Sequence, residues 1–420
     1  MDQTNKKRFE IVVVTGAFPV LSETFIVNPI IQLIETGHRI RIIPLSPKPQ
    51  TARIHDDIKK YRLMDSVTYP AAMAPGKWGK RCKAVLGFLK LFFRRGWRAV
   101  QILRANLRCE NGFCYTRLFF SFDLFKTDFD LVHCHFGPNA AMLVDLKKAG
   151  LDIPLITSFH GYDVNSYPRQ AGQKCYQDLF ALGELFTANT HFTKNKMLRL
   201  GCPEHKIHII HESLRCDTFF VPLSERPASG EVVTLLTVGR MVEKKGYAYS
   251  LKAMALLKSR GYRFRYWMVG DGPLMGHYKQ MAAELNITED VTFLGEQTQA
   301  EVLNLYRQAD IFILPSIEAA DGDCEGQGLV LQEAQMAGIP VVSTLHNGIP
   351  DGVQNGITGL LVPEKDPIQL ADKIEYLIQN PHVRLEMGQR GQEFVRSKFD
   401  VGRVTEALID LFEKAAGRTN

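Results

Sequence analysis

The chain has 420 residues, of which 45% are hydrophobic and 23% are charged, and its formal net charge is +6. This composition is that of a folded globular protein, and the length is sufficient for two hydrophobic cores. No apolar run approaches the roughly 20 residues that span a bilayer, and the start of the chain lacks the apolar segment of a signal peptide. The eight cysteines form no CxxC pair and no spacing typical of a secreted framework, so a cytoplasmic protein with reduced thiols is expected.

Strands alternate with helices along the first half of the chain. Buried apolar runs predict strands at residues 11–15, 40–44, 131–135, 155–159, 186–189 and 207–211, and helical periodicity predicts helices at residues 28–35 and 140–148. The following stretch, residues 217–230, has the proline and glycine content of a linker. Alternation of this kind is typical of a parallel sheet covered by helices.

The same alternation continues in the second half. Strands are expected at residues 232–238, 263–269, 291–294, 311–314 and 341–343, each followed by helical or glycine-rich sequence. Closing helices are expected at residues 370–379, 384–399 and 401–415. The predicted fold class is therefore α/β, with two doubly wound, Rossmann-like domains.

Positive charge is concentrated in one island. Between Lys77 and Arg117 there are eleven Lys or Arg residues and a single acidic residue, Glu110, so the rest of the chain is net negative. Aromatic and aliphatic residues at partly helical spacing, including Trp78, Phe93 and Trp97, are interleaved with these charges. Such a helix fits an anionic membrane surface; alternatively, it belongs to the core of the first domain and presents a solvated basic face. A nucleic-acid partner is not expected, because no nucleic-acid-binding motif accompanies the charge.

A basic loop follows the strand predicted at residues 232–238. Gly239 breaks the strand and Gly246 precedes a helical pattern, so Arg240, Lys244 and Lys245 lie in the connecting loop. Open α/β sheets bind ligands at this end of their strands. The planar fork of Arg and the point charge of Lys together suit a diphosphate; the alternative is an ordinary solvated loop.

Two carboxylates bracket a second glycine-rich segment, EGQGLVLQE, from Glu325 to Glu333. Gly326 and Gly328 allow a tight turn and a close approach to a ligand, and a helix is expected to begin near Leu329. A carboxylate accepts paired hydrogen bonds from vicinal diols, so the pair would suit the two ends of a nucleotide-sugar. On its own this spacing is equally compatible with two solvated residues beside a helix cap.

Taken together, these motifs resemble the GT-B glycosyltransferases of family 4, a retaining family, and within it the bacterial exopolysaccharide and capsule branch, which includes colanic-acid-like enzymes. The resemblance rests on G-R-x-x-x-x-K-G from Gly239, V-G-D-G from Val269, F-L-G from Phe293, L-P-S from Leu314, the Glu325 and Glu333 pair, and G-x-P-V-V-S-T from Gly338. Further matches in the first half are F-P-x-x-S-E-T-F from Phe18, H-x-H-F from His133 and S-F-H-G-Y-D from Ser158.

The resemblance implies a domain plan. Residues 1–220 would form an acceptor-binding domain, residues 221–398 a nucleotide-sugar-binding domain, and residues 399–420 a helix that crosses back to the first domain. The two domains would face each other across a cleft that holds the active site. The donor would be a nucleotide-sugar, and the acceptor a glycan that we hypothesise to be lipid-linked. Such a protein would be cytoplasmic, and the membrane hypothesis would place it peripherally on the inner face of the cell membrane.

The resemblance also implies roles for individual residues. Arg240 and Lys245 would neutralise the diphosphate, Glu333 would hold the ribose, and Glu325 and His160 would lie against the transferred sugar. The resulting donor-binding set is Gly239, Arg240, Lys245, Glu325, Gly326, Gln327, Gly328, Leu329 and Glu333, with His160, Glu325, Arg240 and Lys245 as the catalytic group. Asp163 would orient the His160 loop. His133 and His135 share one face of a predicted strand, so contact with the acceptor or packing in the core is expected for them rather than metal binding.

The first loop departs from the common family pattern. Many members have a Gly-Gly pair after the first strand, where this chain reads TGAFPVLSETF. Gly16, Ser22, Glu23 and Thr24 are the candidates for the corresponding contacts with donor phosphate or acceptor.

The chemistry implied is transfer with retention of the anomeric configuration, by front-face substitution and without a metal or cofactor. Asp321 and Asp323 imitate a D-x-D metal motif, but their segment is interpreted as a loop, with Mg²⁺ or donor-sugar contact as the alternative. His205, His208 and His211 lie on a predicted extended segment, so a zinc site is not expected there. The alternative functions are a nucleotide-sugar 2-epimerase-like isomerase and a non-catalytic scaffold that binds glycan or lipid.

Overall fold

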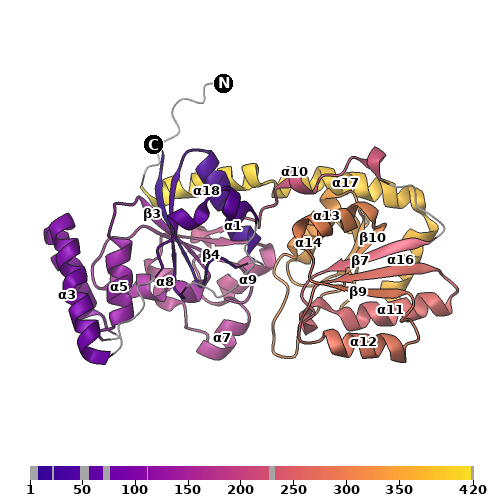
Figure 1. Ribbon diagram of the computed structural model, residues 1–420, viewed down its shortest axis with the longest axis horizontal. Coiled ribbons are helices and arrows are strands. Elements are labelled where there is room, and N and C mark those ends of the chain that lie inside the picture. The colour runs from indigo at the N-terminus through magenta and orange to yellow at the C-terminus, as the bar shows by residue number, and fades with distance from the viewer. Residues whose placement is uncertain are drawn as a thin grey trace, which may run out of the picture. The chain divides into compact units, whose positions relative to one another are not determined.

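The computed structural model describes residues 8–20, 23–47, 56–69, 76–110, 112–226 and 232–417, with only the backbone described for residues 76 and 77. Two compact units divide the chain (Figure 1). Unit 1 contains Met1–Ala188, Lys194–Ile210 and Thr405–Asn420, and unit 2 contains Asn189–Thr193 and His211–Val404. Each unit is built on its own sheet.

The sheet of unit 1 has the strand order β2-β1-β3-β4-β5-β6, and every neighbouring pair runs parallel. Its strands are β1 (Glu10–Thr15), β2 (Arg39–Pro44), β3 (Leu131–His135), β4 (Leu155–Phe159), β5 (Leu185–Ala188) and β6 (Ile207–Ile209). The central strands β3 and β4 are buried along their whole length. This is expected where helices cover both faces of a parallel sheet.

The helices of the first half are α1 (Thr24–Glu35), α2 (Asp56–Lys60), α3 (Gly76–Arg95), α4 (Trp97–Arg108), α5 (Tyr115–Leu124), α6 (Ala141–Lys148), α7 (Ser166–Ala171), α8 (Gln177–Leu182) and α9 (His191–Arg199). Most of the last helix, α18 (Val401–Ala415), also belongs to unit 1 (Figure 1). The buried residues Leu408, Leu411 and Phe412 recur at helical spacing, and they share a core cluster with Phe9 of the first strand region. The Phe9 and Phe412 rings meet edge to face, with their centroids 6.3 Å apart.

The sheet of unit 2 has the strand order β12-β11-β10-β7-β8-β9, again with parallel neighbours. Its strands are β7 (Val233–Val238), β8 (Phe264–Val269), β9 (Val291–Gly295), β10 (Ile311–Leu314), β11 (Val341–Thr344) and β12 (Gly359–Val362). Its helices are α10 (Cys216–Phe219), α11 (Tyr247–Ser259), α12 (Met275–Glu284), α13 (Gln299–Gln308), α14 (Leu329–Met336), α15 (Ile349–Gly352), α16 (Pro367–Gln379) and α17 (Pro381–Phe399).

Gly246 lets helix α11 begin directly against the end of strand β10. Its φ is +71°, and a Cβ atom at this position would lie 1.8 Å from the carbonyl oxygen of Pro315. Only glycine fits, both because of the left-handed backbone and because of the contact. The basic loop before Gly246 is thereby held close to the segment that follows β10.

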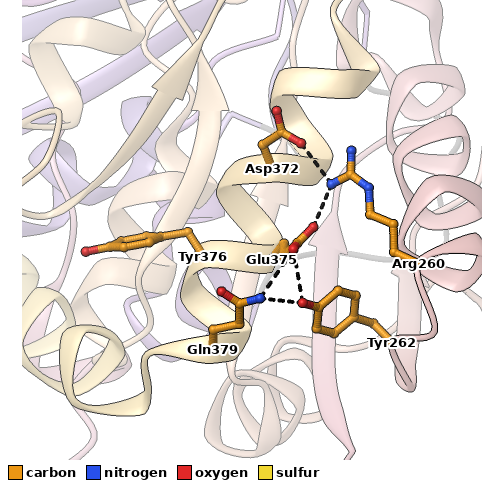
Figure 2. A pocket seen from close by; sticks show the side chains of 6 residues that line it. All are labelled: Arg260, Tyr262, Asp372, Glu375, Tyr376 and Gln379. Atoms are coloured by element: carbon orange, nitrogen blue, oxygen red, sulfur yellow. Dashed lines mark hydrogen bonds and ion pairs between the residues drawn. The ribbon is translucent and has the colours of Figure 1, made fainter.

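A polar network fastens the end of α11 to α16 on the surface of unit 2 (Figure 2). Arg260 pairs with Asp372 at 2.8 Å and with Glu375 at 2.6 Å. Tyr262 donates to Glu375 at 3.0 Å and receives a hydrogen bond from Gln379. The depression that these residues line with Tyr376 has a volume of about 390 Å³. These polar groups bond to one another, so we interpret the network as a structural connection between the two helices.

The structure confirms the predicted fold class, an α/β chain with two parallel, helix-covered sheets. Several strands end a residue or two from their predicted limits. A strand ends where its hydrogen bonds to the neighbouring strand end, and the apolar sequence does not always end at the same residue. Strand β12 was missed altogether. It has only four residues, GLLV, which is too short for periodicity to distinguish a buried strand from other apolar sequence.

Candidate functional site

The basic loop of residues 239–246 lies at the carboxyl end of strand β7. The Gly239 N–H donates to the carbonyl of Val269 at 3.0 Å, and the Met241 N–H donates to the carbonyl of Asp271 at 2.9 Å, so the loop is tied to the end of β8. It finishes in a short 3₁₀ turn, Glu243–Lys245. Arg240 is exposed on this loop. The edge of the sheet where parallel strands end is the usual ligand site of such folds.

Lys245 and Glu325 form an ion pair at this edge. Lys245 Nζ lies 2.5 Å from Glu325 Oε2, and each side chain is only 13% exposed. Burial acts to raise the pKa of Glu325, but the ammonium groups of Lys245 and Lys244 outweigh it, so this pKa lies below its ordinary value. Glu325 is therefore held as a carboxylate. The structure brings this acid and this base together although they are 80 positions apart in the sequence.

Glu333 lies one turn into helix α14 in a different environment. The hydroxyl group of Tyr306, a fully buried residue, donates to Glu333 Oε2 at 2.9 Å. Burial raises the pKa of Glu333 to about 7, although the Tyr306 hydrogen bond and the charge of Lys245 act in the opposite direction. Lys245 thus influences both carboxylates of the pair.

Helix α14 begins at Leu329, where the sequence predicted its start. Gly328 precedes it with φ +76°, a left-handed conformation that glycine adopts at little cost. The side chain of Gln327 is occupied by protein: its Oε1 accepts from the N–H of Glu212 at 2.8 Å and its Nε2 donates to the carbonyl of the same residue at 3.0 Å. Gln327 can therefore offer a ligand its backbone, while its side chain secures the turn.

Unit 1 contains a second cluster of predicted residues, around Asp163. One oxygen of Asp163 accepts from the N–H groups of His160 at 3.0 Å and Gly161 at 2.9 Å, and the other accepts from the N–H of Gly137 at 3.2 Å. Gly137 follows strand β3 and His160 follows strand β4, so this fully buried carboxylate ties the ends of two adjacent strands together. Burial nevertheless raises the pKa of Asp163, against the opposing effects of His160 and these backbone donors.

Three histidines line the same region. His135 Nδ1 lies 3.1 Å from His160 Nε2, and their rings stack with centroids 5.3 Å apart. His133 Nε2 lies 2.7 Å from the hydroxyl oxygen of Ser158. Burial lowers the pKa of His133 to about 3, and burial together with the two neighbouring histidines holds the pKa of His135 well below its usual value. Both rings are therefore neutral at physiological pH.

The first loop places Glu23 near His160 of this histidine cluster. Thr24 is the first residue of α1, and Glu23 precedes it. Burial raises the pKa of Glu23 to about 7, and the nearby His160 acts against that rise. The ring of Phe25 lies over His160, with centroids 4.6 Å apart. Gly16 follows strand β1, and a Cβ atom there would lie 3.5 Å from the Asn139 amide. The remaining candidate of this loop, Ser22, lies outside the described residues.

Three residues that matter to the geometry were not predicted from the sequence: Tyr306, His346 and Glu364. Tyr306 lies on α13, far in sequence from the Glu333 that it contacts. His346 and Glu364 follow strands β11 and β12, and together they contact the segment that contains Glu325. The sequence carries one indication of this contact: His346 stands in a glycine-containing turn shortly after a buried strand.

The segment with Asp321 and Asp323 is a loop, as predicted. The Asp321 side chain accepts from the N–H of Asp323 at 2.9 Å, and Asp323 pairs with Lys244 at 3.1 Å. Within the part of the chain that the structure describes, no group of three or more His, Cys, Asp or Glu side chains has the arrangement of a metal site.

Helix α3 carries most of the basic island, and its two faces differ. Leu91 is buried, and Ala84 and Phe88 pack against the core of unit 1. Gly87 permits close contact with α5, because a Cβ atom there would lie 2.8 Å from the Phe122 ring. The alternative prediction, that this helix belongs to the core of the first domain, therefore holds for one of its faces.

The other face of α3 is exposed and largely apolar. Trp78 is 77% exposed and Phe93 is 86% exposed, and Trp97 at the start of α4 is 61% exposed. We call this surface the basic aromatic face; its exposed residues are Trp78, Arg81, Val85, Leu86, Leu89, Lys90, Phe92, Phe93, Arg94, Trp97 and Arg98. Among the described residues, no helix combines the length and apolar character needed to cross a bilayer.

Two family descriptions match consecutive parts of the chain. Residues 22–217 match Glycosyltransferase Family 4, and residues 224–394 match Glycosyl transferases group 1. The first match contains strands β2 to β6 of the unit 1 sheet but not β1, and the second contains strands β7 to β12 of the unit 2 sheet. The second match includes both Glu325 and Glu333 and the whole basic loop.

Named relatives match over almost the entire chain. The putative colanic acid biosynthesis glycosyltransferase WcaL of Salmonella typhimurium is 30% identical over 94% of this chain and 97% of its own length. The amylovoran biosynthesis glycosyltransferase AmsK of Erwinia amylovora is 30% identical over 96% of this chain and 98% of its own length.

Solved structures share the fold. A glycosyltransferase from Rickettsia africae superposes with a TM-score of 0.71 at 19% identity, covering 99% of this chain and 100% of its own. Anabaena HepE, solved with UDP and glucose, gives a TM-score of 0.69 at 15% identity, covering 97% of this chain and 100% of its own. The chain belongs to the glycosyltransferases of family 4, which have the GT-B fold.

Proposed function

We propose that the protein transfers a sugar from a nucleotide-sugar donor to a glycan acceptor during the synthesis of a cell-surface polysaccharide. The observation that carries this proposal is the buried Lys245 and Glu325 ion pair, whose lysine also acts on Glu333, at the edge where the unit 2 strands end. The names of the relatives WcaL and AmsK support a role in exopolysaccharide biosynthesis. Unit 2 would bind the donor and unit 1 would receive the acceptor.

The donor contacts follow from the charges of unit 2. Arg240, exposed on its loop, and Lys245 would bind the diphosphate, which needs two positive charges close together. Glu333 would accept from the ribose hydroxyls and Glu325 from hydroxyls of the sugar. The backbone N–H groups of Gly326, Gln327, Gly328 and Leu329 would supply further donors at the start of α14, and Gly239 would let the basic loop approach closely.

The histidine cluster of unit 1 would face the reacting sugar and the acceptor. His160 would lie against the transferred sugar, with Asp163 holding its loop through two backbone N–H groups. His135 supports the His160 ring by stacking. Gly16, Ser22, Glu23 and Thr24 would contact phosphate or acceptor. A neutral, ring-lined surface suits the apolar faces and hydroxyls of a sugar better than fixed charge does.

The proposed reaction retains the anomeric configuration. The acceptor hydroxyl would attack the same face from which the diphosphate departs, with the departing phosphate accepting the proton. Arg240 and Lys245 would stabilise the negative charge that grows on the diphosphate, which is electrostatic catalysis by preorganised groups. In this scheme no carboxylate serves as a nucleophile, and neither a metal nor an organic cofactor is required.

We further propose that the acceptor is lipid-linked and that the protein works peripherally on the inner face of the cell membrane. The basic aromatic face supports this: large exposed rings lie beside arginines, with Arg81 5.6 Å from the Trp78 ring centroid and Arg104 5.1 Å from that of Trp97. Burial of such rings among lipid headgroups is favourable, and each basic residue adds about 1 kcal/mol near an anionic surface.

Thermal stabilisation by a panel of UDP-, GDP-, ADP- and dTDP-sugars tests the donor proposal. A ligand that binds only the folded state raises its stability, by about 2.7 kcal/mol at 100 times the dissociation constant. We expect one nucleotide class to raise the melting temperature. If no nucleotide-sugar raises the melting temperature of the folded protein, the proposed donor site is wrong.

Sedimentation with vesicles of phosphatidylglycerol and phosphatidylcholine tests the membrane proposal. Replacement of four basic residues by Gln should weaken binding by about 100-fold or more at low salt; the four are Arg81, Lys90, Arg94 and Arg98. A matched control replaces four exposed basic residues of unit 2 by Gln, namely Lys252, Arg263, Arg265 and Lys373. Equal vesicle binding by the two variants would contradict a membrane role for the basic aromatic face.

A further inference from the structure

The carboxylate of Glu364 is connected to both ends of the loop from Glu318 to Glu325. It contacts the start directly and the end through His346. Glu364 lies two residues after strand β12 and its side chain is 30% exposed. Its Oε2 accepts from the backbone N–H of Glu318 at 3.0 Å, at the start of the loop. Its Oε1 lies 2.6 Å from Nδ1 of His346, which contacts the other end.

His346 passes this support on to Glu325. Its side chain is fully buried, and its Nε2 accepts from the backbone N–H of Glu325 at 3.2 Å. A backbone N–H can only donate, so Nε2 carries no proton and the neutral ring is protonated on Nδ1, toward Glu364. The Asn347 amide nitrogen, 3.0 Å from Nε2, is compatible with the same tautomer.

Further contacts of the loop come from the 3₁₀ turn that contains Lys245. The Glu243 carboxylate accepts from the N–H of Ala320 at 3.1 Å. Lys244 pairs with Asp323 at 3.1 Å and donates to the carbonyl of Cys324 at 3.3 Å. These contacts hold the middle of the loop. Of the interactions described at the end of this loop, only the hydrogen bond to His346 involves the backbone N–H of Glu325.

The turn after His346 also packs directly on this segment. A Cβ atom on Gly348 would lie 2.1 Å from the carbonyl oxygen of Gly326, so the two backbones touch. Lys245 thus holds the carboxylate of Glu325, and His346 holds its backbone N–H. The next residue, Gly326, is held by its contact with Gly348.

We propose that Glu364 and His346 are positioning residues for the donor sugar, acting as a relay that fixes the backbone of Glu325. Neither residue needs to touch the donor. Because Glu325 faces the sugar in the proposed function, on which this inference rests, the relay governs recognition of the sugar. The nucleotide is held by other groups, Arg240 and Glu333. Loss of the relay therefore weakens binding of a nucleotide-sugar more than binding of the nucleoside diphosphate alone.

The substitution Glu364→Gln tests the relay without a ligand. A carboxylate accepts on both oxygens, whereas the amide of Gln accepts on one and donates from the other. If the NH₂ group of the new amide takes the place of Oε2, the Glu318 N–H loses its acceptor. If the NH₂ group instead faces His346 Nδ1, the proton of His346 must move to Nε2, and the ring can no longer accept from the Glu325 N–H. Hydrogen exchange of the ligand-free protein, followed in peptides that cover residues 317–326, should therefore be faster by about fivefold or more.

The matched control is Glu375→Gln, the same change at a carboxylate of similar exposure, 25%, in the polar network between α11 and α16 (Figure 2). This control should leave exchange in residues 317–326 unchanged. Equal exchange in wild-type protein and the Glu364→Gln variant would overturn the relay, whatever the donor proves to be.

A binding comparison tests its effect on sugar recognition. The probes are UDP with UDP-glucose, GDP with GDP-mannose, ADP with ADP-glucose and dTDP with dTDP-glucose, from which the pair that binds wild-type protein is used. For His346→Ala, we expect the dissociation constant of the nucleotide-sugar to rise about tenfold, and that of the nucleoside diphosphate to change by less than about twofold. His346→Gln, whose amide oxygen can accept from the Glu325 N–H, should recover part of the loss.

The two proposals fail in different ways. If the His346→Ala variant binds the nucleotide-sugar as tightly as wild-type protein does, or loses both ligands equally, the positioning role is wrong and the donor site stands. If wild-type protein binds none of the probes, the proposed function is wrong, and with it the role of the relay in sugar recognition.

Discussion

The candidate sites of the two units use polar groups in opposite ways. In unit 2, full charges meet: Lys245 is paired with Glu325 and Lys244 with Asp323, and the charges of these lysines keep Glu325 ionised despite its burial. In unit 1, the corresponding region contains the stacked rings of His135 and His160, and burial keeps His133 and His135 neutral. The carboxylate of Asp163 accepts hydrogen bonds from three backbone N–H groups there.

In the proposed function, this difference corresponds to two kinds of ligand. A diphosphate is bound by positive charge. An ion pair holds the lysine side chain in position before the diphosphate binds. A sugar hydroxyl is bound by neutral donors and acceptors, and its ring carbons by aromatic faces. Substitutions in unit 2 should therefore act on donor affinity and transfer, whereas substitutions in unit 1 should act on transfer or stability with donor affinity preserved.

The largest effect is expected for Glu325→Ala. The variant should lose transfer by at least about 100-fold, because the sugar loses an ionised acceptor that is preorganised by Lys245. Circular dichroism should show a native fold. The control is Glu289→Ala, an exposed residue of the same unit. Transfer at the wild-type rate by the Glu325 variant would remove this residue from the site.

A smaller effect on transfer is expected for His160→Ala in unit 1. Transfer should fall by about 10-fold to 100-fold, since the sugar loses the ring packed among Phe25, Phe136 and His135. Donor affinity, measured by titration calorimetry, should stay within about twofold. His205→Ala, an exposed histidine of the same unit, provides the comparison. A parallel loss of donor affinity would break the distinction between the two sites.

Asp163→Asn should act on stability. The two oxygens of Asp163 accept from three backbone N–H groups, and an amide can accept on only one side, so at least one buried donor loses its partner. The free energy of unfolding should fall by about 1–3 kcal/mol, measured by urea denaturation. The exposed Asp152→Asn variant should match wild-type protein. Unchanged stability of Asp163→Asn would mean that these hydrogen bonds do not hold the loop.

The smallest effect is a pH dependence from Glu333. With its pKa at about 7, Glu333 gains charge between pH 6 and pH 8, so the affinity for the donor should rise by up to about tenfold over this interval. A diphosphate esterified at both ends has no further proton to lose there. Glu333→Gln should bind more weakly and show a flat profile; a wild-type profile that is equally flat would contradict the assignment.

The same shift has a consequence for stability. Folding raises the pKa of Glu333 above its ordinary value of 4.5, so the folded state holds its proton more tightly than the unfolded state does. This residue therefore lowers the free energy of unfolding as pH rises from about 4.5 to about 7. In the Glu333→Gln variant that loss should be absent, and thermal unfolding at several pH values would reveal the difference.

Much of the fold could be predicted from the sequence because its strands are short, apolar and separated by glycine. Residues 131–135, 155–159 and 311–314 were predicted at the limits that the structure shows. Strand β12 was missed because its four residues carry no periodicity. The start of α14 at Leu329 could be predicted because glycines mark it on the preceding side.

The candidate site divides in the same way. Arg240, Lys245, Glu325 and Glu333 could be named from local motifs. The first two follow a predicted strand, and the two acids bracket the glycine turn at the start of a predicted helix. Their partners could not: Tyr306 meets Glu333, and Glu364 and His346 meet the Glu325 loop, only through the three-dimensional arrangement. The pairing of Lys245 with Glu325 is likewise a product of the fold, because no rule of spacing joins residues 80 positions apart.

The most direct test of the proposed donor site is a crystal structure of the protein with the nucleotide-sugar that raises its melting temperature. We expect diphosphate oxygens within hydrogen-bonding distance of Arg240 and Lys245, ribose hydroxyls on Glu333 and sugar hydroxyls on Glu325. Electron density for the nucleotide-sugar elsewhere, with the Lys245 and Glu325 pair untouched, would contradict it.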